Sequence, residues 1–163
     1  MKGWIPVPGS SKGALALLAL EEFGRNGFEA VNVVDLTARA GLTTGSLYHH
    51  FGNKLGLYGF VRDEAEQRIF DRMEGALEAS GGEGVRRALL VCFDAAVRHG
   101  IGGLLSEPDP RGGKDRLEAL LASHADPHIA PLLMAAWRAA LAQARTHPRS
   151  VEKIRAALTA LFP

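Results

Sequence analysis

The chain has 163 residues, of which 47% are apolar, so it can bury a hydrophobic core and is not an intrinsically disordered protein. The formal net charge is only +1, which excludes a uniformly basic surface and requires any nucleic-acid site to be local. The single cysteine, Cys92, excludes an internal disulfide and a cysteine-based zinc site. No apolar run approaches the roughly 20 residues that span a bilayer. Residues 1–11 also lack a signal-peptide pattern, so we expect a cytoplasmic protein without membrane contact or cofactor.

The spacing of apolar residues predicts an all-α fold. Ala, Leu, Glu and Arg recur at intervals of three and four residues, whereas alternating runs of β-branched and aromatic residues are absent. We expect residues 1–10 to form a flexible arm. The first helix then carries an apolar face that includes Leu15 and Phe23, and it ends at Gly27.

Three further helices are predicted in the N-terminal half. A short helix runs from about Val33 to Ala40, with Asn32 placed to accept a backbone hydrogen bond at its start. Gly41 supplies the left-handed residue that ends this helix, and Thr43 caps the next one. The third helix and a long fourth helix are expected at residues 44–51 and 54–79.

The C-terminal half is predicted to contain four more helices, so that the whole fold has about eight to nine. Residues 80–82, Ser-Gly-Gly, break the fourth helix, and the glycine-rich residues 100–113 are expected to be mostly loop. Asp126 followed by Pro127 is a strong helix start. The four helices are expected at residues 84–99, 114–123, 127–146 and 149–161.

Residues 33–51 have the parts of a helix-turn-helix. Small Thr37 allows the two helices to approach closely, Gly41 turns the chain, and Leu47 fills the small core between them. The second helix of such a pair enters the major groove by its N-terminal end. The same spacing also fits a helical hairpin within a bundle.

The distribution of charge favours DNA binding by the N-terminal part. No carboxylate occurs between Asp35 and Asp63. Residues 63–126, in contrast, hold 13 acidic residues against 8 lysines and arginines. Because DNA is a polyanion, the acid-free segment is the one expected to meet it.

The run from Gly41 to Lys54, Gly-Leu-Thr-Thr-Gly-Ser-Leu-Tyr-His-His-Phe-Gly-Asn-Lys, resembles the signature of the TetR/AcrR family of transcription regulators. The resemblance covers roughly residues 12–61 and is only architectural in the C-terminal half. It implies a homodimer in which residues 11–53 bind operator DNA and residues 54–163 sense a ligand and dimerise, with residues 54–79 as the linking helix. Further matching positions are Phe23, Gly27, Phe28, Val33, Asp35, Leu36 and Ala40.

The resemblance implies that polar residues around the second helix of the motif face DNA. Tyr48 and Lys54 are expected to bind phosphates, while Thr44 and His49 are expected to contact base edges. Gly45 leaves the backbone N–H groups at the helix start open to a phosphate. The full set is Thr43, Thr44, Gly45, Ser46, Tyr48, His49 and Lys54.

A few neighbouring residues are less clearly assigned. Arg39 and Lys12 either reach the DNA backbone or are ordinary solvated side chains. Thr37 replaces the alanine usual in the family, and its hydroxyl is expected to bond the carbonyl of Val33. Gly56 stands where the family prefers a polar residue and costs about 1 kcal/mol of helix propensity, so we expect fraying at this joint.

The last two helices carry the pattern of an oligomer interface. Apolar residues repeat at spacings of three, four and three in the final helix, and alanines line the helix before it. Two helices from each subunit would form a four-helix interface, as the family resemblance also implies; the alternative is that both helices close a monomeric core. The predicted interface residues are Ala136, Ala140, Val151, Ile154, Leu158 and Leu161.

A ligand cavity is expected among the C-terminal helices, with a bias toward an apolar or aromatic effector. Its predicted lining could equally be plain core. His124, Asp126 and His128 raise the alternative of a metal site, and Cys92 that of a redox sensor, but no second shell supports a metal. The predicted lining residues are Met73, Leu77, Leu89, Cys92, Phe93, Leu121, Met134 and Trp137.

The leading hypothesis is a repressor that a small effector releases from a palindromic operator by tilting the fourth helix. One rival is a small-molecule enzyme on a helical bundle, for which no nucleophile, base and orienting group occur at useful spacing. The other is a protein-interaction bundle with a vestigial DNA-binding domain.

Overall fold

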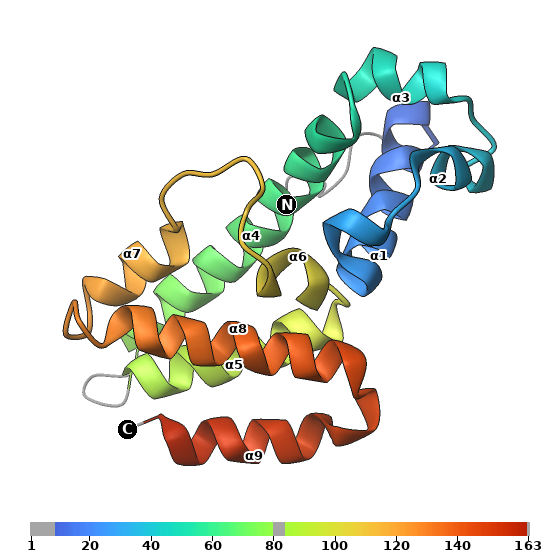
Figure 1. Cartoon of the computed structure of the whole chain (residues 1–163). Coiled ribbons are helices and arrows are strands. Elements are labelled where there is room, and N and C mark those ends of the chain that lie inside the picture. The colour runs from blue at the N-terminus through green and yellow to red at the C-terminus, as the bar shows by residue number, and fades with distance from the viewer. Residues whose placement is uncertain (1–8, 80–83, 163) are drawn as a thin grey trace.

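The computed structural model describes residues 9–79 and 84–162, and every regular element in this part of the chain is helical (Figure 1). The predicted all-α class is confirmed. Most of the arm predicted for residues 1–10, and all of the break predicted for 80–82, lie outside the described residues. The elements are α1 (Ser11–Ala30), α2 (Val33–Arg39), α3 (Thr44–Phe51), α4 (Lys54–Ala79), α5 (Gly84–Arg98), α6 (Gly102–Ser106), α7 (Arg116–Ala122), α8 (Ala130–Thr146), a 3₁₀ helix (Pro148–Ser150) and α9 (Val151–Leu161).

Helices α1, α2 and α3 lie together at one end of the molecule, and α4 runs from this end into the C-terminal bundle (Figure 1). The regular part of α1 ends as predicted, because Gly27 has a φ of 79° and kinks the chain before a final turn. The predicted cap of α2 is also confirmed, since the Asn32 side chain accepts a hydrogen bond of 2.8 Å from the N–H of Val34. Local sequence signals therefore set the boundaries of this unit.

The turn between α2 and α3 is closed by backbone hydrogen bonds around Gly41. Gly41 has a φ of 68°, and the next N–H, that of Leu42, donates to the carbonyl of Thr37 at 2.9 Å. This is the Schellman arrangement, which favours glycine. The Thr37 hydroxyl donates to the carbonyl of Val34 at 3.0 Å, so the predicted bond to Val33 is wrong by one residue. The hydroxyl therefore bonds the carbonyl three residues back and not the one four residues back.

Fraying at the start of α4 was expected from Gly56, but the structure shows a capped turn. The Gly56 N–H donates to the Asn53 side chain at 2.8 Å. A Cβ at Gly56 would lie 2.0 Å from the carbonyl oxygen of Phe51. The glycine is therefore required by the close approach of the end of α3, which outweighs its low helix propensity.

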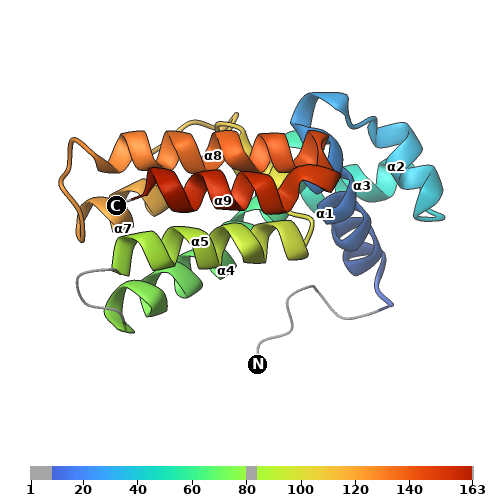
Figure 2. The same ribbon diagram turned by 90° about the horizontal axis from the view of Figure 1, so that it is seen from below.

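The C-terminal bundle places α5, α8 and α9 side by side, with α4 against α5 (Figure 2). One continuous apolar core runs through both the N-terminal unit and this bundle. An ion pair holds the last helix in place: Nε of Arg155 on α9 lies 2.8 Å from a carboxylate oxygen of Asp94 on α5. Among the described residues, no helix has the length and hydropathy needed to cross a bilayer.

Residues 100–113 are mostly loop, as expected, but Gly102–Ser106 form the short helix α6, whose Leu104 and Leu105 are fully buried. One boundary in the second half of the chain needs correction. The helix expected at Pro127 begins instead at Ala130. Asp126 caps only a turn, in which its side chain accepts a 2.7 Å hydrogen bond from the N–H of His128. The first turn of α8 contains Pro131 instead.

Candidate nucleic-acid interface

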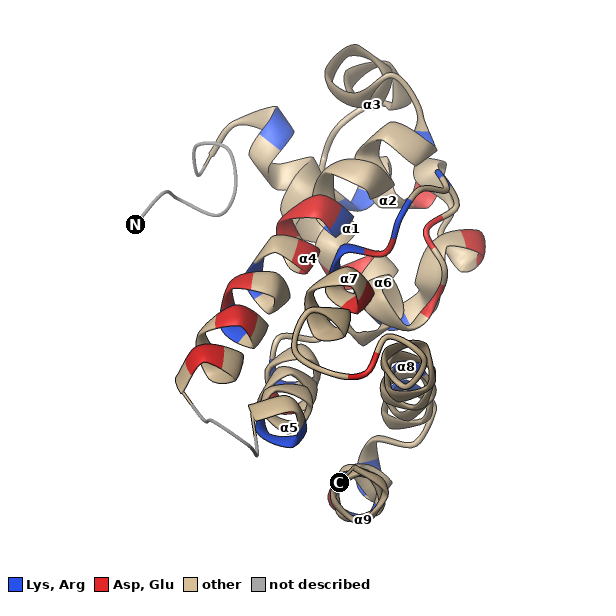
Figure 3. Ribbon diagram, turned by 90° about the vertical axis from the view of Figure 1, so that its left-hand side faces the viewer, with Lys and Arg blue, Asp and Glu red and all other residues tan. Residues whose placement is uncertain are grey.

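Helix α3 is held on the outside of the N-terminal unit by a single fully buried side chain, Leu47. Leu36 and Thr37 of α2 are each 2% exposed, and Leu36 belongs to the same core as Leu47, in agreement with the small core predicted for the helix-turn-helix. Phe51 at the end of α3 is half-buried against the same core, and the exposed residues of α3 face outward. Figure 3 shows that α3 lies at one extremity of the molecule and carries no lysine, arginine or carboxylate.

The outward face of α3 is formed by Gly45, Tyr48 and His49, which are all exposed. Gly45 and His49 are one helical turn apart, so they share a face. Tyr48 is 53% exposed despite its size, which leaves its hydroxyl available to a phosphate oxygen. Thr44 and Ser46 flank this face and are half-buried.

Thr43 has the capping role predicted for it. Its hydroxyl oxygen accepts a hydrogen bond of 3.3 Å from the N–H of Ser46, and the two hydroxyl oxygens are also 3.3 Å apart. With this oxygen engaged, Thr43 fixes where α3 begins. The positive end of the α3 dipole is thereby presented beside the exposed face, where it favours an anion.

The cations near α3 are held against the protein. The ammonium of Lys54 donates to the carbonyl of Glu29 at 3.3 Å and lies 4.6 Å from the centre of the Phe28 ring. The ammonium of Lys12 lies 5.7 and 5.2 Å from the ring centres of two phenylalanines near the α3–α4 turn. Both ammonium groups therefore lie against aromatic rings of the N-terminal unit.

Arg39, which the sequence left open as a contact to the DNA backbone, is paired within the protein. Its guanidinium lies 2.5 Å from a carboxylate oxygen of Glu22 on α1. This hydrogen bond raises the pKa of Arg39. In this structure the side chain ties α2 to α1.

Comparison with known proteins finds a family model that matches this unit. The sequence model of the family described as "Bacterial regulatory proteins, tetR family" matches residues 17–59, which run from α1 through the helix-turn-helix into α4. The expected resemblance to the TetR family is confirmed for this unit, and it supports a DNA-binding regulator.

Solved structures extend the TetR-type likeness over nearly the whole chain. A TetR-family transcriptional regulator from Pectobacterium atrosepticum is 25% identical with a TM-score of 0.61, covering 90% of this chain and 89% of that one. A transcriptional regulator from Aquifex aeolicus VF5 is 22% identical with a TM-score of 0.59, covering 94% and 100%. A γ-butyrolactone receptor is 18% identical with a TM-score of 0.52, covering 92% and 97%. The last two show the fold.

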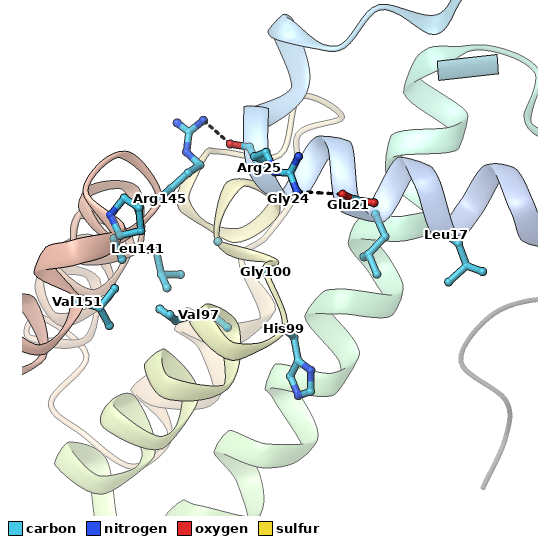
Figure 4. Close-up of a pocket in the computed structure, with 15 residues that line it drawn as sticks. Leu17, Glu21, Gly24, Arg25, Val97, His99, Gly100, Leu141, Arg145 and Val151 are labelled. Atoms are coloured by element: carbon cyan, nitrogen blue, oxygen red, sulfur yellow. Dashed lines mark hydrogen bonds and ion pairs between the residues drawn. The ribbon is translucent and has the colours of Figure 1, made fainter. Parts of the chain in front are cut away.

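The residues predicted to line a ligand cavity are buried among the C-terminal helices. All eight are buried and belong to the continuous apolar cluster. The indole N–H of Trp137 donates to the carbonyl of Leu89 at 3.0 Å, which fixes the ring across the bundle. None of the eight lines the apolar cavity of about 560 Å³ that lies between α1 and the ends of α5 and α8 (Figure 4). The predicted residues were Met73, Leu77, Leu89, Cys92, Phe93, Leu121, Met134 and Trp137.

Most of the predicted interface residues pack within their own subunit. Ala140, Ile154 and Leu158 are buried between α8, α9 and α5, while Ala136 and Val151 are half-buried. Leu161 alone among the six predicted residues is well exposed, at 62%. Val151, Ile154 and Leu158 therefore form the apolar stripe by which α9 packs on its own subunit, and Leu161 lies outside it.

The structure gives other roles to the residues considered for a metal site and a redox sensor. The described residues contain no group of three or more potential metal ligands, and the side chains of His124 and Asp126 make hydrogen bonds to their own turns. Cys92 is fully buried, with its sulfur 3.6 Å from the carbonyl of Ile69. Burial raises the pKa of the Cys92 thiol to about 12, so it is a protonated core residue at neutral pH.

Arg62 is a connecting residue that the sequence analysis did not single out. It lies on α4, is 3% exposed, and donates from Nη1 to the carbonyl of Glu107 at 3.0 Å and to the carbonyl of Leu104. It thus joins α4 to α6 and the loop that follows. The available signal was an arginine on the apolar face of the fourth helix, between Tyr58 and Ala65 at helical spacing.

Proposed function

We propose that this chain is a transcription repressor that binds a palindromic operator as a homodimer and leaves it when a small effector binds. The observation that carries DNA recognition is the exposed, carboxylate-free face of α3, centred on Gly45, Tyr48 and His49. In this proposal Thr44 and His49 contact base edges, and Tyr48 and Lys54 bind phosphates.

Dimerisation is proposed because α3 has only eight residues and touches few base pairs. Two copies on half-sites about one helical turn apart would supply the missing affinity and specificity. An unpartnered surface supports this proposal: Leu132 on α8 is 69% exposed and Leu161 on α9 is 62% exposed. Small exposed residues that allow close packing lie beside them on the same two helices, namely Ala135, Ala139, Ala156, Ala157 and Ala160.

The proposed division of labour gives residues 11–53 to DNA binding and residues 54–163 to sensing and dimerisation. A carboxylate that bridges the two parts supports communication between them. Glu107, after α6, accepts a hydrogen bond of 3.3 Å from the N–H of Phe28 on α1. The same carboxylate accepts one of 3.4 Å from Arg145 on α8. A movement of Arg145 on α8 would therefore act on α1 of the DNA-binding unit through the Glu107 side chain.

A small effector is proposed from the apolar character of the C-terminal bundle, and the γ-butyrolactone receptor, a receptor by its name, shares the fold. An effector that shifts the bundle would move α4, which carries its other end into the DNA-binding unit.

Selection of bound duplexes from a random DNA pool by the full chain tests the proposed function. We expect the selected sequences to converge on a palindrome with two half-sites about one helical turn apart. Footprinting is expected to protect both half-sites at a stoichiometry of two chains per site. If no sequence is enriched over several rounds, a protein-interaction bundle is the better description of this chain.

A further inference from the structure

An apolar pocket lies at the joint between the DNA-binding unit and the C-terminal bundle. Its volume is about 560 Å³, within the range of sites for small organic ligands. Figure 4 shows that it is enclosed by α1 on one side and by the ends of α5 and α8 with the start of α9 on the other. The apolar part of the lining is formed by Leu17, Leu20, Ala96, Val97, Leu141 and Val151.

One end of this pocket carries a guanidinium with weak partners. Arg145 of α8 donates to the carbonyl of Arg25 at 3.5 Å and to the carboxylate of Glu107 at 3.4 Å, both at the long limit of hydrogen bonds. Its Nε is buried and has no hydrogen-bond partner in the described part of the chain. The other arginine at the rim, Arg25, is paired with Glu21 at 2.9 Å. Arg145 is therefore the rim cation best placed to receive a new anion.

We propose that this pocket binds a small organic acid with an apolar tail, whose carboxylate pairs with Arg145 and whose tail fills the space between α1 and α8. The inference rests on the proposed function as a ligand-responsive regulator and names the effector class and its site. An apolar lining with one guanidinium at its end fits such a molecule. Charge-assisted pairing with a planar guanidinium supplies the orientation.

Binding at this place acts on the joint directly. The ligand carboxylate competes with Glu107 for Arg145, and Glu107 is the group that accepts from the N–H of Phe28 beyond the kink in α1. The contact beside the pocket is tight, since a Cβ at Gly24 of α1 would lie 2.0 Å from the carbonyl oxygen of Gly100 after α5. A ligand carboxylate that takes Arg145 from Glu107 weakens the bridge through Glu107, so α1 can shift relative to the bundle and move α3 with it.

Calorimetric titration of the full-length chain with decanoate, and separately with decanol, tests the site without DNA. The two probes share an apolar tail, and only decanoate carries the acid. We expect saturable binding of decanoate, weakened about tenfold or more by Arg145→Gln, with decanol binding unchanged by that variant. Arg149→Gln, a charge-matched change on an exposed residue outside the pocket lining, is expected to leave both affinities unchanged.

A second variant tests the tail. Val97→Phe fills the pocket, and at an unchanged melting temperature it is expected to abolish binding of both probes. Decanoate binding that survives both Arg145→Gln and Val97→Phe, or absence of binding to the wild-type chain, overturns the site. Adding decanoate to the complex with the selected operator is then expected to release DNA. Binding that leaves operator affinity unchanged would keep the site and overturn its link to the proposed repressor.

Discussion

Nη1 of Arg62 donates a hydrogen bond of 2.8 Å to the hydroxyl of Tyr58, one turn earlier on α4, and both side chains are buried. This hydrogen bond satisfies the buried hydroxyl, and the Tyr58 ring lies edge-on to that of Phe23, with ring centres 5.1 Å apart. The guanidinium in turn joins α4 to α6 and its loop. The pair therefore stands where the N-terminal unit meets the bundle.

Substitutions of Tyr58 and Arg62 are expected to lower the free energy of unfolding by different amounts. Tyr58→Phe loses one hydrogen bond and is expected to lower the free energy of unfolding by about 1 kcal/mol. Arg62→Met leaves the carbonyls of Leu104 and Glu107 without their donor and is expected to cost about 2–4 kcal/mol. Denaturant unfolding followed by circular dichroism measures both, and equal losses would contradict this assignment.

Two glycines of α4 make a matched comparison. Gly56→Ala would place a Cβ 2.0 Å from the carbonyl oxygen of Phe51 and is expected to destabilise by at least about 1–3 kcal/mol. Gly75→Ala, on the same helix with nothing within 4 Å of its Cβ position, is expected to stabilise by about 0.5–1 kcal/mol. Melting temperatures that move in opposite directions check this. A gain in both variants would mean that Gly56 is not needed for packing.

Variants of a residue that contacts bases and of one that contacts phosphates are expected to change DNA binding in different ways. Thr44→Ala should relax preference at one base position by about 1 kcal/mol. Lys54→Ala should weaken binding to specific and random duplexes alike and reduce the salt slope by about 1. Titrations at several salt concentrations measure both, with Lys114→Ala, an exposed residue before α7, as the control for a lost charge. Identical effects of Thr44→Ala on both kinds of duplex would place Thr44 outside base recognition.

Cys92 is expected to be inert in the native protein. Because burial raises its thiol pKa from 9.0 to about 12, the folded state holds this proton more tightly than the unfolded state. The contribution to stability is complete below about pH 9 and falls as the pH rises toward 12. Alkylation at pH 8 should therefore follow the rate of unfolding, measured with and without denaturant. Rapid labelling of the native chain would restore a sensor role.

The sequence predicted the N-terminal unit well because its signals are local. Asn32 and Thr43 each bond N–H groups two or three residues ahead, and Gly41 closes a turn with its own neighbours. Such signals are complete within one short segment of chain. The outward face of α3 followed from the inward position of Leu47.

The connections between the units depend on pairs far apart in the sequence. The N–H of Phe28 reaches the carboxylate of Glu107 across 79 positions, and Arg62 reaches the carbonyl of Leu104 across 42. Neither pairing leaves a periodic trace in the sequence. The short helix α6 was missed for the same reason, since its burial comes from packing against α1 and α8 and not from its own propensity. The joint pocket is formed by these long-range contacts and could not be located beforehand.

The central claim is that the outward face of α3 meets DNA, and a carboxylate placed on that face tests it most directly. Gly45→Glu puts the acid on α3, where the new Cβ meets only the Thr43 oxygen at an ordinary 3.5 Å. Gly75→Glu makes the same charge change on α4 with nothing within 4 Å. Measured on the selected operator, Gly45→Glu should lose more than about tenfold in affinity while Gly75→Glu binds like the wild type. Equal affinities of the two variants would contradict the claim.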